Sequence, residues 1–113
     1  MKQLTLNQSV LDELVKGMVS ILQDNVISIV LYGSVARGTD TWESDVDIAI
    51  LLRDPISRET RGQLDDFLGE MDLKHDKLFS VIDITEKMFE TWKNAVPFYK
   101  NVSEEGIVLW KAA

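Results

Sequence analysis

Residues 31–52 constrain this chain more than any other stretch, and they read LYGSVARGTDTWESDVDIAILL. Two apolar runs, at 26–32 and 46–52, flank a turn of small residues and predict two buried strands. Asp45 and Asp47 stand two residues apart at the start of the second run, so both carboxylates should share one face of that strand. We therefore expect two acidic groups at one end of a sheet.

Two aspartates this close repel each other unless something lies between them. At a spacing of roughly 6.6 Å along a strand, two unit charges repel by about 2.5 kcal/mol at an effective dielectric constant near 20. This repulsion would raise the pKa of one carboxyl group, and a divalent cation would remove it. The chain has no cysteine and its single histidine is distant in sequence, so oxygen ligands are expected, and these favour Mg²⁺ or Mn²⁺.

The turn between the two strands carries groups suited to phosphate. Gly33 lets backbone amides approach an anion, Ser34 offers a hydroxyl, and Arg37 adds a positive charge nearby. Taken alone, Gly33 and Ser34 are also typical of an ordinary turn in which the serine caps a helix. Together with the aspartates, they favour a triphosphate that binds along with the metal ion.

Written as one motif, these residues are GSx10DxD, from Gly33 and Ser34 to Asp45 and Asp47. The motif resembles that of the DNA polymerase beta-like nucleotidyltransferase superfamily, and the short chain resembles its minimal nucleotidyltransferases, the antitoxins of HEPN/MNT toxin-antitoxin pairs. The resemblance implies an α/β (α+β) nucleotidyltransferase fold, with a small mixed sheet of about three strands flanked by helices. It also implies a third metal carboxylate on a later strand, for which Asp83 is the candidate.

The resemblance further implies a metal-dependent enzyme that transfers a nucleoside monophosphate, AMP from ATP, to a hydroxyl group of a protein partner. That partner would be a HEPN ribonuclease toxin. The carboxylates that would bind Mg²⁺ or Mn²⁺ and take part in catalysis are Asp45, Asp47 and Asp83. The residues that would bind the nucleotide phosphates are Gly33, Ser34 and Arg37. Two alternatives remain open: a catalytically silent antitoxin that only binds its partner, and a transferase that acts on a small-molecule hydroxyl.

Length and charge limit the other functions. With 113 residues, we expect a single minimal nucleotidyltransferase domain over residues 1–113. The formal net charge of -7 disfavours direct nucleic-acid binding, because phosphate contacts need a surplus of lysine and arginine, so a protein acceptor is favoured. The amino-terminal residues lack the apolar segment of a secretion signal, and no run is long enough to span a membrane. We therefore expect a cytoplasmic protein.

The rest of the chain predicts helices that cover the sheet. Apolar residues recur at helical spacing over 5–24, 56–71 and 86–94. Residues 72–77 read as a charged connection, and 78–84 as a strand with Asp83 near its end. A helix between two strands predicts a parallel crossover, which should bring Asp83 near the aspartate pair.

The sequence leaves the roles of three smaller features open. The final run IVLW is either a short strand or a docking segment. His75, the only histidine, has no partner nearby in sequence and is expected at the surface. The aromatic residues that belong either to the core or to a partner contact are Trp42, Phe98, Tyr99 and Trp110.

Overall fold

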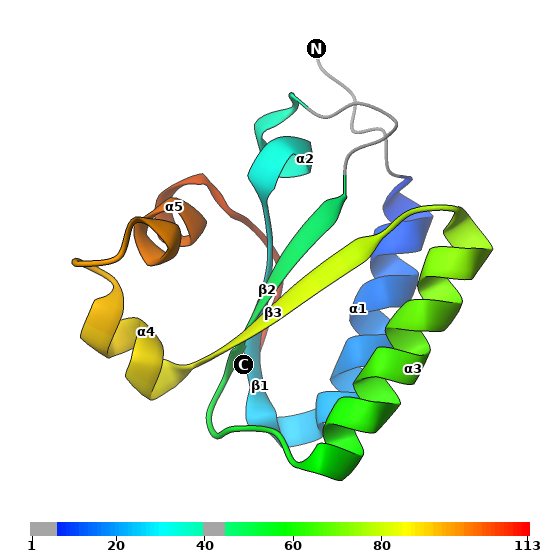
Figure 1. Cartoon of the computed structure of the whole chain (residues 1–113), viewed down its shortest axis with the longest axis horizontal. Coiled ribbons are helices and arrows are strands. Elements are labelled where there is room, and N and C mark those ends of the chain that lie inside the picture. The colour runs from blue at the N-terminus through cyan, green and yellow to red at the C-terminus, as the bar shows by residue number, and fades with distance from the viewer. Residues whose placement is uncertain (1–6, 40–44) are drawn as a thin grey trace.

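The computed structural model describes residues 7–39 and 45–113. The elements, in chain order, are α1 (Gln8–Leu22), the 3-10 turn η1 (Gln23–Asn25), β1 (Val26–Tyr32), α2 (Gly33–Arg37), β2 (Val46–Leu52), α3 (Arg58–His75), β3 (Phe79–Thr85), α4 (Glu86–Trp92), α5 (Pro97–Glu105) and β4 (Ile107–Lys111). The sheet lies between two layers of helices, with α1 and α3 on one side and α4 and α5 on the other (Figure 1). The short helix α2 lies at the end of the sheet where β2 begins (Figure 1).

The strands form one mixed sheet in the order β3-β2-β1-β4. β1 pairs antiparallel with β2 and β4, and β2 pairs parallel with β3 across the α3 connection. The predicted fold class and parallel crossover are therefore confirmed. The sheet has four strands instead of about three, because the IVLW run forms β4 and covers the backbone groups that β1 would otherwise leave unpaired.

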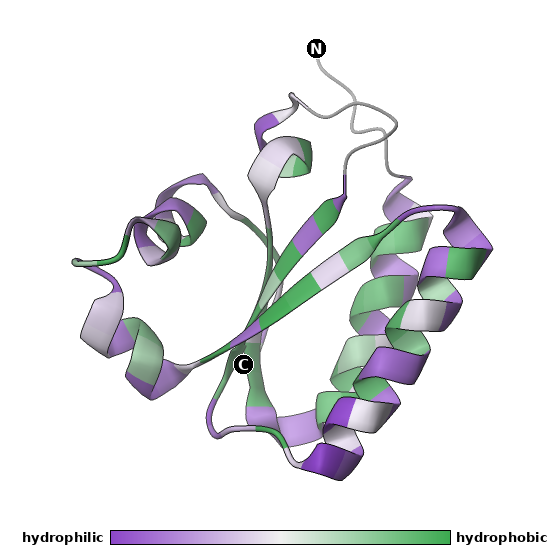
Figure 2. Ribbon diagram, viewed as in Figure 1, coloured by the Kyte–Doolittle hydropathy of each residue, from purple (hydrophilic) through white to green (hydrophobic). Residues whose placement is uncertain are grey.

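Two apolar clusters attach the helices to the sheet. The larger cluster lies under α1 and α3 and contains Ile48 and Ile50 of β2, while the smaller lies under α4 and α5 and contains Ala49. Figure 2 shows the strands largely in green, as expected for a sheet covered on both faces. Because side chains alternate along a strand, Asp47 shares the face of Ala49 and points to the α4 and α5 side.

Three of the four aromatic residues with open roles pack against these clusters. Phe98 and Tyr99 pack against the smaller cluster, and Trp110 packs against the larger one. The Phe98 ring meets the Tyr32 ring edge-on, with centroids 5.5 Å apart. Trp42 lies outside the described residues.

Polar residues cap three of the helices. The side chains of Asn7, Ser57 and Thr85 accept hydrogen bonds from backbone N–H groups in the first turns of α1, α3 and α4. α3 is longer than predicted: it continues through most of the expected connection and ends at His75, and the next residue, Asp76, has a φ of 51°. Among the described residues, no helix is long and apolar enough to cross a membrane.

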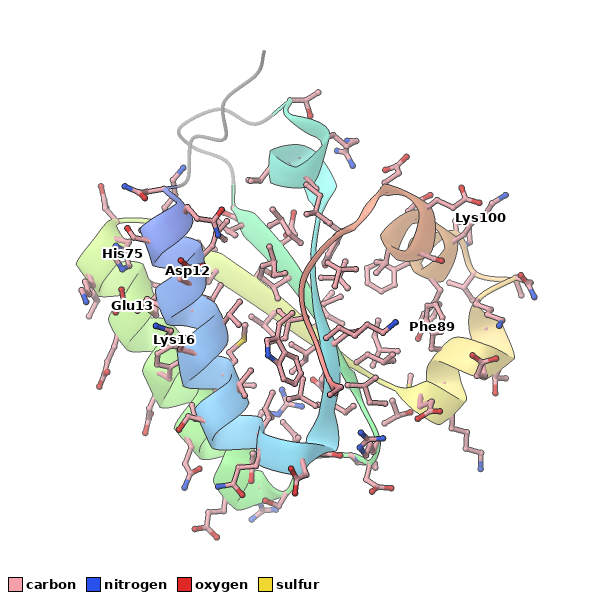
Figure 3. The ribbon with its side chains drawn as sticks, turned by 180° about the vertical axis from the view of Figure 1, so that it is seen from behind. Asp12, Glu13, Lys16, His75, Phe89 and Lys100 are labelled. Carbon is pink, nitrogen blue, oxygen red and sulfur yellow. The ribbon has the colours of Figure 1, made fainter. Side chains whose placement is uncertain are left out.

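The extra length of α3 changes the position of His75, which the sequence placed at the surface. Its side chain is only 19% exposed, and Nε2 lies 3.0 Å from Oε1 of Glu13 on α1. Lys74 donates a hydrogen bond of 2.7 Å to the other oxygen of Glu13. The hydrogen bond from Lys74, and then that from His75, lower the pKa of Glu13. Figure 3 shows Glu13 and His75 side by side, so this group links α1 to α3.

Candidate active site

β1, α2 and the start of β2 meet at one end of the sheet (Figure 1), and Asp47 is the second residue of β2. It pairs with Tyr32, the last residue of β1, and the next residue, Gly33, begins α2. A Cβ atom on Gly33 would collide with Oδ2 of Asp47. Gly33 also has a φ of 74°, in the left-handed region that favours glycine. Glycine thus brings the first half of the motif into contact with the second half.

The turn after β1 is a short helix with a defined end. Gly38 ends α2 with a φ of 72°, and its N–H donates to the carbonyl oxygens of Ser34 and Val35. This single turn places Arg37 three residues after Ser34, which brings both side chains to neighbouring positions on the helix surface. Nη1 of Arg37 lies 3.7 Å from Oε2 of Glu105, the last residue of α5. The turn predicted after the first apolar run is therefore present, and it takes the form of a short helix that ends at Gly38.

Three influences act on the pKa of Asp47. Burial raises it first, the charge of Asp45 raises it further, and the charge of Arg37 lowers it, so that the pKa lies above its usual value. Asp45 itself is exposed and precedes β2. The pKa of Tyr32 is also raised, by burial and then by the charge of Asp47. The repulsion expected between the two carboxylates is therefore present in the fold.

We expect Asp47→Asn to raise the thermal stability of the metal-free protein at neutral pH. Because the pKa of Asp47 is raised in the folded state, folding favours the protonated carboxyl. This contribution to stability is fully present below the usual value of 3.8 and is lost as pH rises through the raised pKa. Asparagine does not ionise, so the variant should not lose this stability as pH rises. Melting temperatures in EDTA from about pH 3 to 8 should diverge as pH rises. A variant less stable than wild type at neutral pH would contradict the argument.

Asp83 lies outside this cluster, and the prediction that β3 brings it near the aspartate pair is wrong. β3 does lie parallel to β2, but Asp83 pairs with Ile50, three residues beyond Asp47. Residues three apart on a strand point to opposite faces, so Asp83 faces α3 while Asp47 faces the other side. On that side Oδ1 of Asp83 accepts a hydrogen bond of 2.7 Å from Nη2 of Arg61 on α3.

Loss of this ion pair should have a small effect on folding. Asp83→Asn is expected to lower the free energy of unfolding by about 1 kcal/mol or less, because the side chains of Arg61 and Asp83 are 42% and 27% exposed. A double-mutant cycle of Asp83→Asn with Arg61→Gln, measured by urea unfolding, would isolate the coupling between the two residues. A coupling energy of zero within error would show that the pair contributes nothing to stability.

The β3 residue beside Asp47 is Ser80, which was not among the predicted site residues. Two residues before Ser80, the carbonyl oxygen of Leu78 accepts a 2.8 Å hydrogen bond from the Val46 N–H. β3 therefore presents a hydroxyl, and not a carboxylate, beside Asp47. Among the described residues, no group of three or more acidic, histidine or cysteine side chains is placed to hold a metal ion.

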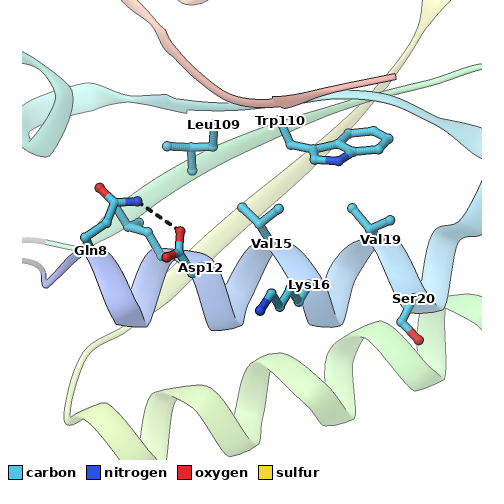
Figure 4. A pocket seen from close by; sticks show the side chains of 9 residues that line it. Gln8, Asp12, Val15, Lys16, Val19, Ser20, Leu109 and Trp110 are labelled. Atoms are coloured by element: carbon cyan, nitrogen blue, oxygen red, sulfur yellow. Dashed lines mark hydrogen bonds between the residues drawn. The ribbon is translucent and has the colours of Figure 1, made fainter. Parts of the chain in front are cut away.

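A separate groove of about 560 Å³ lies between α1 and β4. Val15 and Val19 of α1 point across it toward Leu109 and Trp110 of β4 (Figure 4). None of its lining residues belongs to the GSx10DxD motif, and most of the groove surface is apolar. The groove is therefore distinct from the site around Asp47.

Comparison with known families agrees with the motif and its geometry. Residues 16–112 match the family described as Polymerase beta, Nucleotidyltransferase. The chain belongs to this family. Two proteins of Methanocaldococcus jannaschii, each named as a predicted protein adenylyltransferase, are relatives of this nucleotidyltransferase. MJ0141 is 33% identical over 82 residues, which cover 73% of this chain and 82% of the relative. MJ0604 is 32% identical over 108 residues, which cover 91% of this chain and 97% of the relative.

Solved structures share the fold of this nucleotidyltransferase. One is a chain of a toxin-antitoxin complex with AMP-PNP, with a TM-score of 0.62 and 23% identity over 95% of this chain and 75% of that chain. Another is a chain of the complex between a tri-AMPylated HEPN toxin of Shewanella oneidensis and its MNT antitoxin. Its TM-score is 0.59 and its identity 19%, over 95% of this chain and 74% of that chain. At this level of identity the likeness shows the fold.

Proposed function

We propose that this nucleotidyltransferase transfers AMP from ATP to a hydroxyl group of a protein partner, and that the partner is a HEPN-domain toxin. The observation that carries the proposal is the contact between Gly33 and the carboxylate of Asp47. This contact brings the turn at Gly33, whose groups can bind phosphate, next to the Asp47 carboxylate, which can bind a metal ion. The names of the two archaeal relatives and the toxin-antitoxin complexes with the same fold support a protein as the acceptor.

The donor set fits a divalent cation. Asp45 and Asp47 supply carboxylate oxygens. Burial, and then the charge of Asp45, raise the pKa of Asp47, and a nearby cation would favour the charged carboxylate. Such oxygen ligands suit Mg²⁺ or Mn²⁺, which proteins often hold with one or two carboxylates and the substrate phosphates. When bound, the ion would neutralise charge on the triphosphate and polarise the α-phosphate.

The turn after β1 would bind the other end of the nucleotide. The Ser34 hydroxyl and the backbone N–H groups beside it would donate to the β- and γ-phosphate oxygens, and Arg37 would balance their charge. The acceptor hydroxyl oxygen then forms a bond to the α-phosphorus. The bond from the α-phosphorus to the oxygen of the leaving pyrophosphate breaks, and the hydroxyl proton passes to solvent. Both products, the AMP ester and pyrophosphate, account for all atoms of the ATP.

Charge is a further reason to expect a protein acceptor. The net charge of -7 would repel a nucleic acid, and no excess of lysine and arginine offsets it. A HEPN ribonuclease must bind RNA and is expected to carry positive charge at its active site, so an acidic partner would associate with it favourably.

The proposal is tested by labelling. The protein is incubated with radiolabelled ATP, Mg²⁺ and a HEPN-domain protein encoded beside it, and the partner is examined for label and for a mass increase of one AMP. Wild type should label the partner, whereas Asp45→Asn should bind the partner without labelling it. A tight complex with full inhibition of the toxin, and no label from any nucleoside triphosphate, would identify a silent binding antitoxin instead.

A further inference from the structure

We propose that Ser80 occupies the position of the third metal carboxylate, so that this chain binds one divalent ion with the triphosphate and not two. The inference rests on the proposed function, because it specifies the metal content of the same site. It follows from the strand register, which places a neutral hydroxyl where a shared ligand for a second ion would have to lie.

The neighbours of Asp47 across the sheet are known on both sides, because β2 lies between β1 and β3. Its partner on β1 is Tyr32 and its partner on β3 is Ser80. Paired residues of neighbouring strands share a face and lie about 5 Å apart, which is close enough for two side chains to bind one ion. Neither partner is a carboxylate. The next residues along the same face, Ala49 and Ile82, are apolar and pair with each other.

Asp83 and Glu105 are each paired with an arginine. Asp83 would need to move about 10 Å along its strand and to the opposite face. A one-residue slip of β3 would turn its side chain over but would also remove Phe79, which is 4% exposed, from the larger core cluster. Glu105, near Arg37, is paired with that arginine. Among the described residues, no third acidic, histidine or cysteine side chain joins the aspartate pair in a group that could hold a metal ion.

The charge of the site also favours a single ion. Asp45 and Asp47 are the two anionic ligands that the protein adds to the oxygens of the triphosphate. A third carboxylate would add another anionic ligand for a second cation, and serine adds none. The hydroxyl of Ser80 instead can donate a hydrogen bond to a phosphate oxygen or accept one from the acceptor hydroxyl.

The test counts bound Mn²⁺ by electron paramagnetic resonance, with AMP-PNP present so that no reaction occurs. Wild type should bind one Mn²⁺ per chain, and Ser80→Asp should bind two, since it introduces a carboxylate beside Asp47. Ser80→Ala is the matched control and should bind one. Asp83→Asn should also bind one, and this count keeps the test decisive if Ser80→Asp fails to fold.

Two results would overturn the inference alone. In the first, the wild type binds two ions and Asp83→Asn binds only one. In the second, Ser80→Asp folds but still binds a single ion. If the wild type binds neither AMP-PNP nor Mn²⁺, the proposed function fails as well, and the inference fails with it. The number of bound ions thus distinguishes failure of the single-ion proposal from failure of the proposed function.

Discussion

Replacement of Asp45 or Asp47 by asparagine should lower the rate of nucleotidyl transfer by about a thousandfold or more, the effect of losing roughly 4 kcal/mol of transition-state stabilisation. An amide oxygen carries no charge and cannot balance a divalent cation beside the triphosphate. Single-turnover labelling of the partner would measure the rate, and calorimetry with Mg²⁺ and AMP-PNP would measure binding. Both variants should lose metal-dependent nucleotide affinity.

The matched control for this result is Asp66→Asn, the same chemical change at an exposed position of α3. It should leave the transfer rate and the metal affinity unchanged. Because Asp47→Asn is expected to be more stable than wild type without metal, its loss of activity cannot be explained by unfolding. Transfer at the wild-type rate by either active-site variant would place the metal site elsewhere in the chain.

Gly33→Ala should destabilise the protein by about 1 to 2 kcal/mol and weaken nucleotide binding at least tenfold. A side chain at a φ of 74° is strained, and its Cβ would collide with the Asp47 carboxylate. The collision moves either the turn or the carboxylate, and both are needed for a triphosphate with its metal ion. Urea unfolding and titration with Mg²⁺ and AMP-PNP would measure the two effects.

Gly62→Ala is the matched control, because it is the same substitution at a glycine where a Cβ atom can be accommodated. Gly62 lies within α3, where a Cβ atom would meet nothing within 4 Å. Alanine should therefore stabilise the helix by up to about 1 kcal/mol and leave nucleotide binding unchanged. If Gly33→Ala behaved like Gly62→Ala, the close approach of the turn to Asp47 would have no functional importance.

Local patterns in the sequence were sufficient for most of the elements. The small residues after the first apolar run predicted the turn at Gly33, and apolar residues at helical spacing predicted α1, α3 and α4. These features depend on contacts between residues a few positions apart, which a sequence displays directly. The end of α3 was missed because charged residues at 72–75 are compatible with both a helix and a connection, and the contact of His75 with Glu13 spans 62 residues.

The sequence by itself determined the motif, the alternation of faces along each strand and the parallel crossover. Alternation already separated Asp83 from Ser80, but it could not say which of the two shares a face with Asp47. Only the tertiary structure decided this, through the register that pairs Ser80 with Asp47 and Asp83 with Ile50. The physical reason is that burial of Phe79 and Val81 against the helices sets how β3 lies on β2. The packing of the core, and not the position of the acidic residue in the chain, selects the side chain that reaches the site.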